Sequence, residues 1–119
     1  MPDQTISGKA FVLGDEVATF EQAYADFTGV SHCVGVANGT DALEMALRAL
    51  DIGPGDEVVV PANTCVASAL AVRRSGATPV LVDVDADHLL IEPGQVAEAV
   101  GPRTRAVMPV HLYGQMAPM

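Results

Sequence analysis

Aromatic residues are scarce in this sequence of 119 residues, which contains no tryptophan, two tyrosines and three phenylalanines. Half of the residues are nevertheless hydrophobic, which is too much for a disordered chain and enough for one compact domain with a single core. The core must therefore consist mainly of valine, leucine, isoleucine and alanine. These residue types fill parallel sheets that are covered on both faces.

Basic residues are also few, because six lysines and arginines stand against fifteen aspartates and glutamates and the formal net charge is −9. This excess of negative charge argues against nucleic acid or an anionic membrane surface as a partner. It leaves a phosphate ligand open, because backbone amides at a helix start bind phosphate without any lysine. No run approaches the roughly 20 apolar residues of a membrane helix, and residues 1–9 do not resemble a signal peptide.

Cysteine occurs only at Cys33 and Cys65, which is too few for a disulfide framework. Each lies in an apolar run, and free cysteines of this kind are commonly buried. We therefore expect two reduced, buried thiols in a cytoplasmic protein.

Hydrophobic spacing and turn residues predict helices and strands in alternation. The expected helices cover residues 15–28, 40–50, 65–75 and 93–100, and the expected buried strands cover 32–37, 57–61, 78–84 and 105–110. Thr40 and Asp41 are expected to cap the second helix, and glycines follow the first and third. This order predicts an α/β fold with three αβα layers and a mainly parallel sheet. The sequence stops soon after a strand, where such a domain normally continues with a helix, so we expect residues 1–119 to form one incomplete domain.

The most informative segment is Asn38-Gly39-Thr40-Asp41, where an expected strand turns directly into a helix. Free amides at such a helix start point beyond the strand end, and Gly39 has no side chain to block close approach, which suits a phosphate. The alternative is an ordinary turn whose Asp41 caps the helix and binds nothing. The segment matches neither the dinucleotide fingerprint nor a P-loop, because the glycine spacing differs and no lysine follows.

Two further polar loops follow strand ends, at residues 61–67 and 111–115. Ligands of open α/β sheets bind beyond the carboxyl ends of strands, so the three loops together favour a shared cleft. His111 in the last loop is more typical of a structural, hydrogen-bonded histidine than of a catalytic one. We expect no metal site.

These motifs, taken in order, resemble the DegT/DnrJ/EryC1/StrS family of sugar aminotransferases. The similarity runs from about Ser7 to Met119 through seven motifs: residues 14–17 together with 20–21, 38–43 (Asn-Gly-Thr-Asp-Ala-Leu), 53–58 (Gly-Pro-Gly-Asp-Glu-Val), 61–67, 76–80, 102–106, and 109–115 (Pro-Val-His-Leu-Tyr-Gly-Gln). Each motif is weak alone, but seven in sequence are specific.

The resemblance implies the N-terminal part of the large domain of an aspartate-aminotransferase-like (fold type I) enzyme. Members of the family bind pyridoxal 5'-phosphate and transfer an amino group from glutamate or glutamine to a nucleotide-linked keto sugar, in amino-sugar and antibiotic biosynthesis. They act as homodimers. By the resemblance, Gly39, Thr40 and Asp41 would hold the cofactor phosphate, and Cys65 stands where the family often has an aromatic residue stacked on the pyridine ring.

The resemblance also implies that this chain contains no catalytic residue. Pyridoxal phosphate chemistry needs a lysine that forms a Schiff base, and in the family this lysine comes after the segment present here. The one lysine of the sequence, Lys9, lies where the family has no catalytic group. Three alternatives stay open: a dehydratase of the same family, a non-catalytic fragment or split-protein interaction module of the same fold, and a nucleotide-binding α/β domain.

Overall fold

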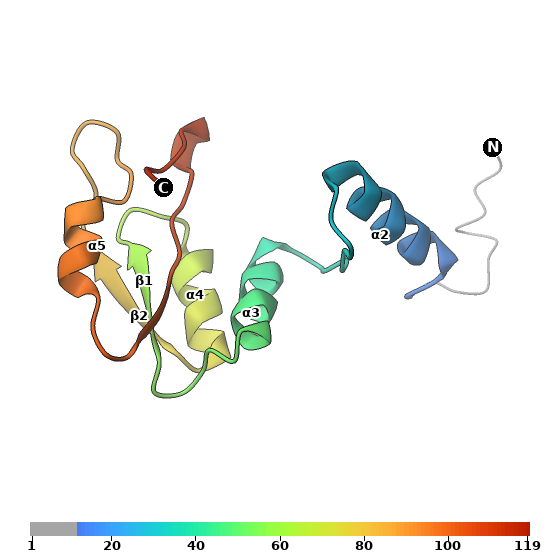
Figure 1. Ribbon diagram of the computed structural model, residues 1–119, viewed down its shortest axis with the longest axis horizontal. Coiled ribbons are helices and arrows are strands. Elements are labelled where there is room, and N and C mark those ends of the chain that lie inside the picture. Colours follow the sequence, from blue (N-terminus) through green and yellow to red (C-terminus); the bar gives the residue numbers. More distant parts are fainter. Residues whose placement is uncertain (1–11) are drawn as a thin grey trace. The chain divides into compact units, whose positions relative to one another are not determined.

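A computed structural model of the protein describes residues 12–119, so Lys9 and the start of the family resemblance at Ser7 lie outside the described residues. The chain divides into two compact units, Met1–Val36 and Ala37–Met119. The first unit contains helix α2 (Asp15–Thr28), drawn in blue in Figure 1, with the bounds that the sequence predicts. Gly29 ends it in the left-handed conformation, with φ of 73°, as a glycine after a helix typically does.

The prediction of a buried strand at residues 32–37 is wrong. The segment has no strand pairing, and apart from the partly buried Cys33 its residues are exposed. Its Gly35 amide donates a hydrogen bond to the Glu21 side chain, 2.6 Å from Oε1. A buried strand needs a neighbouring strand to satisfy its backbone groups, and residues 12–119 provide none for this segment.

The second unit contains a parallel sheet of β1 (Glu57–Pro61), β2 (Thr78–Val82) and β3 (Thr104–Val107) in the order β2-β1-β3. Both pairings of β1 are parallel, as the alternation of elements predicts, and the pairing with β3 shifts register at Glu57/Val58. Strand β2 ends at Val82, before the predicted end at residue 84. Strand β3 begins at Thr104, one residue before the predicted start at 105, and ends at Val107, before the predicted end at 110.

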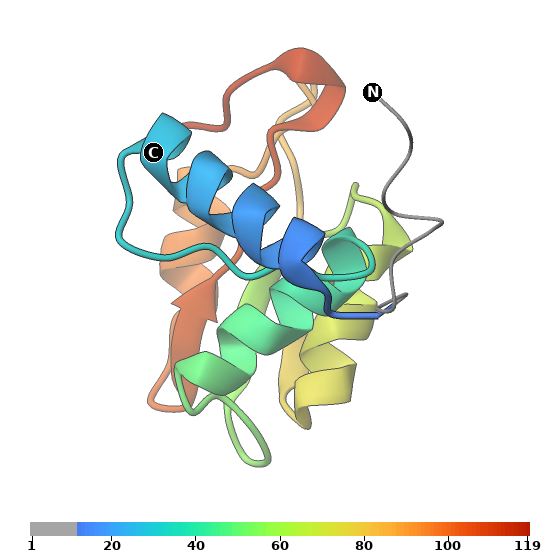
Figure 2. The same cartoon turned by 90° about the vertical axis from the view of Figure 1, so that its right-hand side faces the viewer.

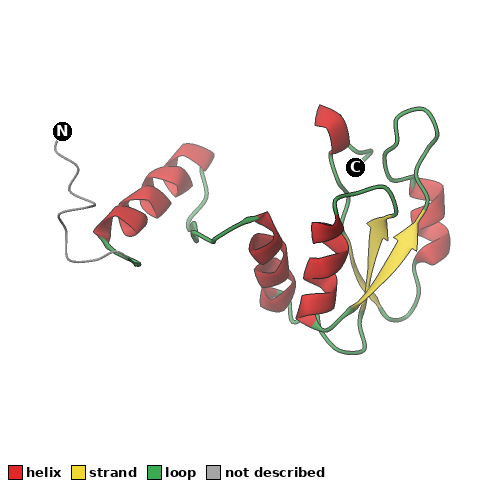
Figure 3. Ribbon diagram, turned by 180° about the vertical axis from the view of Figure 1, so that it is seen from behind, coloured by secondary structure: helices red, strands yellow, loops and turns green. Residues whose placement is uncertain are grey.

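Helices cover both faces of this sheet. They are α3 (Gly39–Ala49), α4 (Val66–Ser75) and α5 (Pro93–Ala99), followed by the short 3-10 helix η1 (Leu112–Gly114). Helices α3 and α4 lie side by side in Figures 1 and 2, and Figure 3 shows α5 on the opposite side of the strands. The predicted αβα layering is therefore confirmed.

The central strand β1 joins the two halves of the core, because successive side chains of a strand point to opposite faces. Its three valines are fully buried. Val58 and Val60 pack with Leu47 of α3 and Val72 of α4. Val59 instead joins the cluster beneath α5, which contains Val82, Ile91 and Ala117.

Both cysteines are free thiols, but the prediction that they are buried is wrong. Cys33 is only partly buried because its segment has no strand neighbour, and Cys65 is exposed because it stands at the start of α4, where the chain leaves the sheet. Among residues 12–119, no helix combines the length and the apolar character needed to cross a bilayer.

Candidate functional site

The loops that the sequence singles out leave the sheet at one edge. Because β1 and β3 run parallel, the segments after them, starting at Ala62 and Met108, emerge at the same side. The N-termini of α3 and α4 lie at this end too, at the top of Figure 1, together with η1. The structure thus brings Asn38–Asp41, Cys65 and His111 to the carboxyl edge of the strands.

The start of α3 is capped by Asn38 and not by Asp41, which corrects the predicted cap. Asn38 has extended backbone angles, and its Oδ1 accepts a hydrogen bond from the Asp41 amide at 3.0 Å. A cap must stand just outside the helix, whereas Asp41 is the third residue inside it. The Asp41 carboxylate closes a reciprocal pair by accepting from Asn38 Nδ2 at 2.9 Å.

The amides of Gly39 and Thr40 are left as the open donors of this helix start. Within residues 12–119 neither has a hydrogen-bond acceptor, in contrast to the Asp41 amide. Gly39 is exposed, and a Cβ added there would meet nothing within 4 Å. Two amides beside an open approach are suited to an anion.

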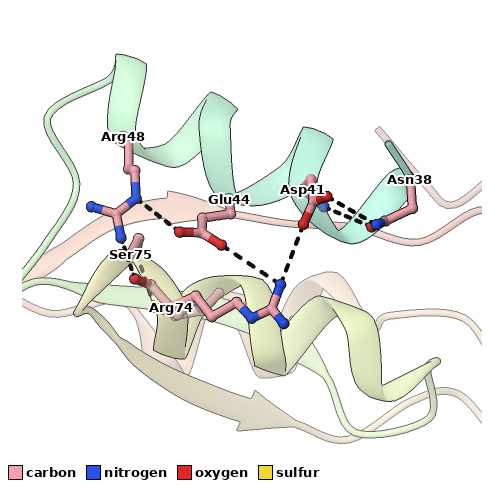
Figure 4. Close-up of polar contacts among 7 residues, drawn as sticks. Asn38, Asp41, Glu44, Arg48, Arg74 and Ser75 are labelled. Carbon is pink, nitrogen blue, oxygen red and sulfur yellow. Dashed lines mark hydrogen bonds and ion pairs between the residues drawn. The ribbon is translucent and has the colours of Figure 1, made fainter. Parts of the chain in front are cut away.

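An ion-pair network ties this first turn to α4, as Figure 4 shows. Arg74 Nη1 lies 3.3 Å from Asp41 Oδ1 and 3.9 Å from Glu44 Oε2. Arg48 pairs with Glu44 through Nε at 2.9 Å and donates from Nη2 to the Arg74 carbonyl at 2.6 Å. The Asp41 carboxylate is therefore held between Asn38 and Arg74.

Cys65 is the N-cap residue of α4, and its side chain makes no capping hydrogen bond. Its exposed thiol stands beside Thr64, whose hydroxyl lies 3.1 Å from that of Ser68 one turn into the helix. The thiol is thus accessible at the carboxyl edge of the sheet.

His111 is hydrogen-bonded within its own loop, where Nδ1 accepts from the Ala117 amide at 2.9 Å. This bond requires the proton of the neutral ring to sit on Nε2. Two residues further on, Tyr113 has φ of 56° and a side chain that is 71% exposed. A tyrosine in the left-handed region is unusual and marks a tight turn in this loop.

Sequence reasoning missed two features of this edge. Arg74 lies in the last turn of α4, where positive charge suits the helix dipole, but its partners on α3 depend on how the two helices pack. Asp85 follows β2, and its carboxylate accepts hydrogen bonds from the backbone amides of Asp87, His88 and Leu90. The hydrogen bond from the His88 amide is the main cause that lowers the pKa of Asp85. A run of alternating aspartates before a turn is the available signal for such a loop.

An apolar hollow lies elsewhere in this unit, against α5. It is lined by Ile91, Pro93, Val96, Val107, Pro109, Pro118 and Met119. Gly39, Thr40, Asp41 and Cys65 do not line this hollow.

Comparison with known proteins identifies similar chains. The family model of the DegT/DnrJ/EryC1/StrS aminotransferase family matches residues 2–119. A dTDP-3-amino-3,6-dideoxy-alpha-D-galactopyranose transaminase from Aneurinibacillus thermoaerophilus is 51% identical over 109 residues, which are 92% of this chain and 30% of that protein. A dTDP-3-amino-3,4,6-trideoxy-alpha-D-glucose transaminase from Streptomyces venezuelae is 52% identical over 92% of this chain and 29% of its own length.

Two solved structures of similar proteins superpose closely on this chain. DesV from S. venezuelae superposes with a TM-score of 0.88 at 49% identity, over 96% of this chain and 31% of its own. The sugar aminotransferase Spr1654 from Streptococcus pneumoniae, described as putative and solved in its PMP form, has a TM-score of 0.89 at 34% identity over 96% of this chain and 29% of its own. The chain thus spans about 30% of the length of these proteins.

Proposed function

The chain belongs to the DegT/DnrJ/EryC1/StrS aminotransferase family, and from this premise we propose that it holds the cofactor phosphate of a pyridoxal-phosphate-dependent sugar aminotransferase. Its fold is that of the corresponding part of fold type I aminotransferases, and the cofactor of the family is pyridoxal phosphate.

The proposed reaction is transamination of a nucleotide-linked keto sugar. Its support is the agreement among relatives whose names specify dTDP-linked and UDP-linked amino sugars. Glutamate or glutamine is the proposed amino donor, a homodimer the proposed assembly and the cytoplasm the proposed location.

The observation that carries the proposal is the pair of open amides at the start of α3. Gly39 and Thr40 would donate to the phosphate, with the partial positive charge of the helix start adding to the attraction. The Asp41 amide is bonded to Asn38, so we narrow the direct contacts to Gly39 and Thr40 and assign Asp41 to shaping the turn. Cys65 would lie against the ring, as the position after Thr64 does in the family.

When bound, pyridoxal phosphate supplies an electron-withdrawing ring that stabilises negative charge on the carbon bearing the amino group. The residues of this chain bind and orient that group. We assign no catalytic side chain here, and Lys9 is given no role.

The transamination test uses the protein at its natural length, with pyridoxal phosphate and glutamate added. The absorbance of the cofactor should shift as its aldehyde form converts to the amine form. A non-catalytic relative would leave the spectrum unchanged with glutamate, and that result would contradict transamination.

The phosphate contact is tested separately by Gly39→Ala. A Cβ at residue 39 meets no protein atom within 4 Å, so the fold tolerates it, but the methyl group occupies the approach of the phosphate. We expect about a tenfold loss of pyridoxal phosphate affinity, as one or two lost charge-assisted hydrogen bonds predict. Gly101→Ala is the matched control, because its Cβ also meets nothing within 4 Å. Equal affinities in the two variants would contradict the assignment.

A further inference from the structure

Arg74 reaches the first turn of α3 although it belongs to the last turn of α4. Helices α3 and α4 run in the same direction (Figures 1 and 2), and long side chains lean toward the N-terminus of their own helix. This lean carries the guanidinium of Arg74 along α3 to Asp41, at 3.3 Å. The hydrogen bond from Arg48 to the Arg74 carbonyl, 2.6 Å long, holds the point from which the side chain extends.

The Asp41 carboxylate is an obstacle to a phosphate at the same helix start. It lies in the same turn as the amides of Gly39 and Thr40, and a helix rises only about 1.5 Å per residue. The Asp41 carboxylate and these two amides are therefore closer together than the electrostatic screening length, which is about 8 Å at physiological salt. In a chain of net charge −9, an uncompensated carboxylate here would repel a second anion.

We propose that Arg74 is a positioning residue for the cofactor phosphate, acting through Asp41. By pairing with the Asp41 carboxylate it offsets the negative charge beside the Gly39 and Thr40 amides, and it holds this carboxylate on the α4 side of the turn (Figure 4). The inference rests on the proposed function and adds to it a residue from a neighbouring helix.

The test compares pyridoxal phosphate with pyridoxal, which lacks the phosphate, in the natural-length protein freed of cofactor. Arg74→Gln should weaken pyridoxal phosphate binding about two- to fivefold, the range expected for a half-exposed ion pair. Pyridoxal affinity should stay unchanged. The loss should shrink in about 1 M salt, where the screening length falls to about 3 Å.

Two variants separate charge from packing. Arg103→Gln changes the net charge equally but removes a pair with Glu57, 2.6 Å long, at the opposite edge of the sheet, and it should leave pyridoxal phosphate affinity unchanged. Adding Asp41→Asn to Arg74→Gln should restore affinity to within about twofold, because the uncompensated charge is gone. A residue that merely joined α3 to α4 would not be rescued in this way.

The outcomes are distinct. If the unmodified protein binds pyridoxal as tightly as pyridoxal phosphate, the phosphate site itself is wrong and both proposals fall. If it prefers pyridoxal phosphate but Arg74→Gln weakens both ligands equally, weakens neither, or is not rescued by Asp41→Asn, the role of Arg74 alone is overturned.

Discussion

At the scale of single residues, Gly76 permits a turn at the end of α4 that a residue with a Cβ would hinder. It ends α4 with φ of 95°, and a Cβ there would lie 3.0 Å from two ring carbons of Pro54. Gly55 has the same φ of 95°, but a Cβ there meets nothing within 4 Å. The two glycines share the conformational requirement and differ only in the space around them.

We therefore predict that Gly76→Ala destabilises the protein more than Gly55→Ala. Both variants carry the left-handed penalty of about 1–2 kcal/mol, and Gly76→Ala adds overpacking of about 1–3 kcal/mol against the rigid proline ring. Denaturant unfolding of the two variants beside the unmodified protein measures the difference. If both variants lose the same free energy of unfolding, the Pro54 ring moves aside at no cost and the prediction is wrong.

Among the structural elements, the loop after β2 depends on one carboxylate. Asp85 accepts amide hydrogen bonds from Asp87, His88 and Leu90, and the residue before it, Val84, pairs with Ile91 in an antiparallel bridge. The loop therefore closes around a charged acceptor. Leu90 and Ile91 at the end of this loop are buried, and Ile91 packs with Val59 and Val82 of the sheet.

The lowered pKa of Asp85 gives this loop a pH dependence. Its causes are led by the hydrogen bond from the His88 amide, and desolvation opposes them. Because the folded pKa lies below the ordinary value of 3.8, the stabilisation is complete above that pH and is lost as the pH falls through the folded pKa. Asp85→Asn should lower stability at neutral pH, and its difference from the unmodified protein should vanish in acid.

Unfolding curves from pH 7 down to acid, with amide exchange at Leu90, measure this effect. Asp87→Asn is the matched control, because among the described residues the Asp87 carboxylate accepts no hydrogen bond. A pH profile of Asp85→Asn parallel to that of the unmodified protein would rule out the linkage.

At the scale of the whole molecule, β1 is the strand on which both faces of the second unit depend. Val60 packs toward α3 and α4, and Val59 packs toward α5, with both fully buried. Leu81 of the neighbouring strand β2 is 61% exposed.

We predict that Val59→Ala and Val60→Ala each destabilise the protein by about 2 kcal/mol, since two buried methyl groups are lost and a small cavity remains. Leu81→Ala should cost less than about 1 kcal/mol despite removing more atoms, because its side chain is largely outside the core. Denaturation midpoints compare the three. If Val59→Ala were as mild as Leu81→Ala, α5 would not form a packed layer.

Much of this architecture follows from local chemistry. Helix α2 and its Gly29 stop, and strand β1, are found where the sequence predicts them, because apolar spacing and glycine act over a few residues. The segment 32–37 and the thiols of Cys33 and Cys65 were predicted as buried, because an apolar run does not reveal whether a partner strand covers it. The expectation of one incomplete domain over residues 1–119 stays a prediction.

The sequence by itself determined the alternation of helices and strands from α3 onward, the parallel sheet and the glycine that opens the start of α3, since periodicity and backbone freedom are local properties. Only the tertiary structure decided that Arg74 on a parallel helix holds Asp41 beside the two open amides. The contact between Arg74 and Asp41 joins residues 33 positions apart, and partners at such a distance are chosen by the packing of helices, which no local pattern encodes.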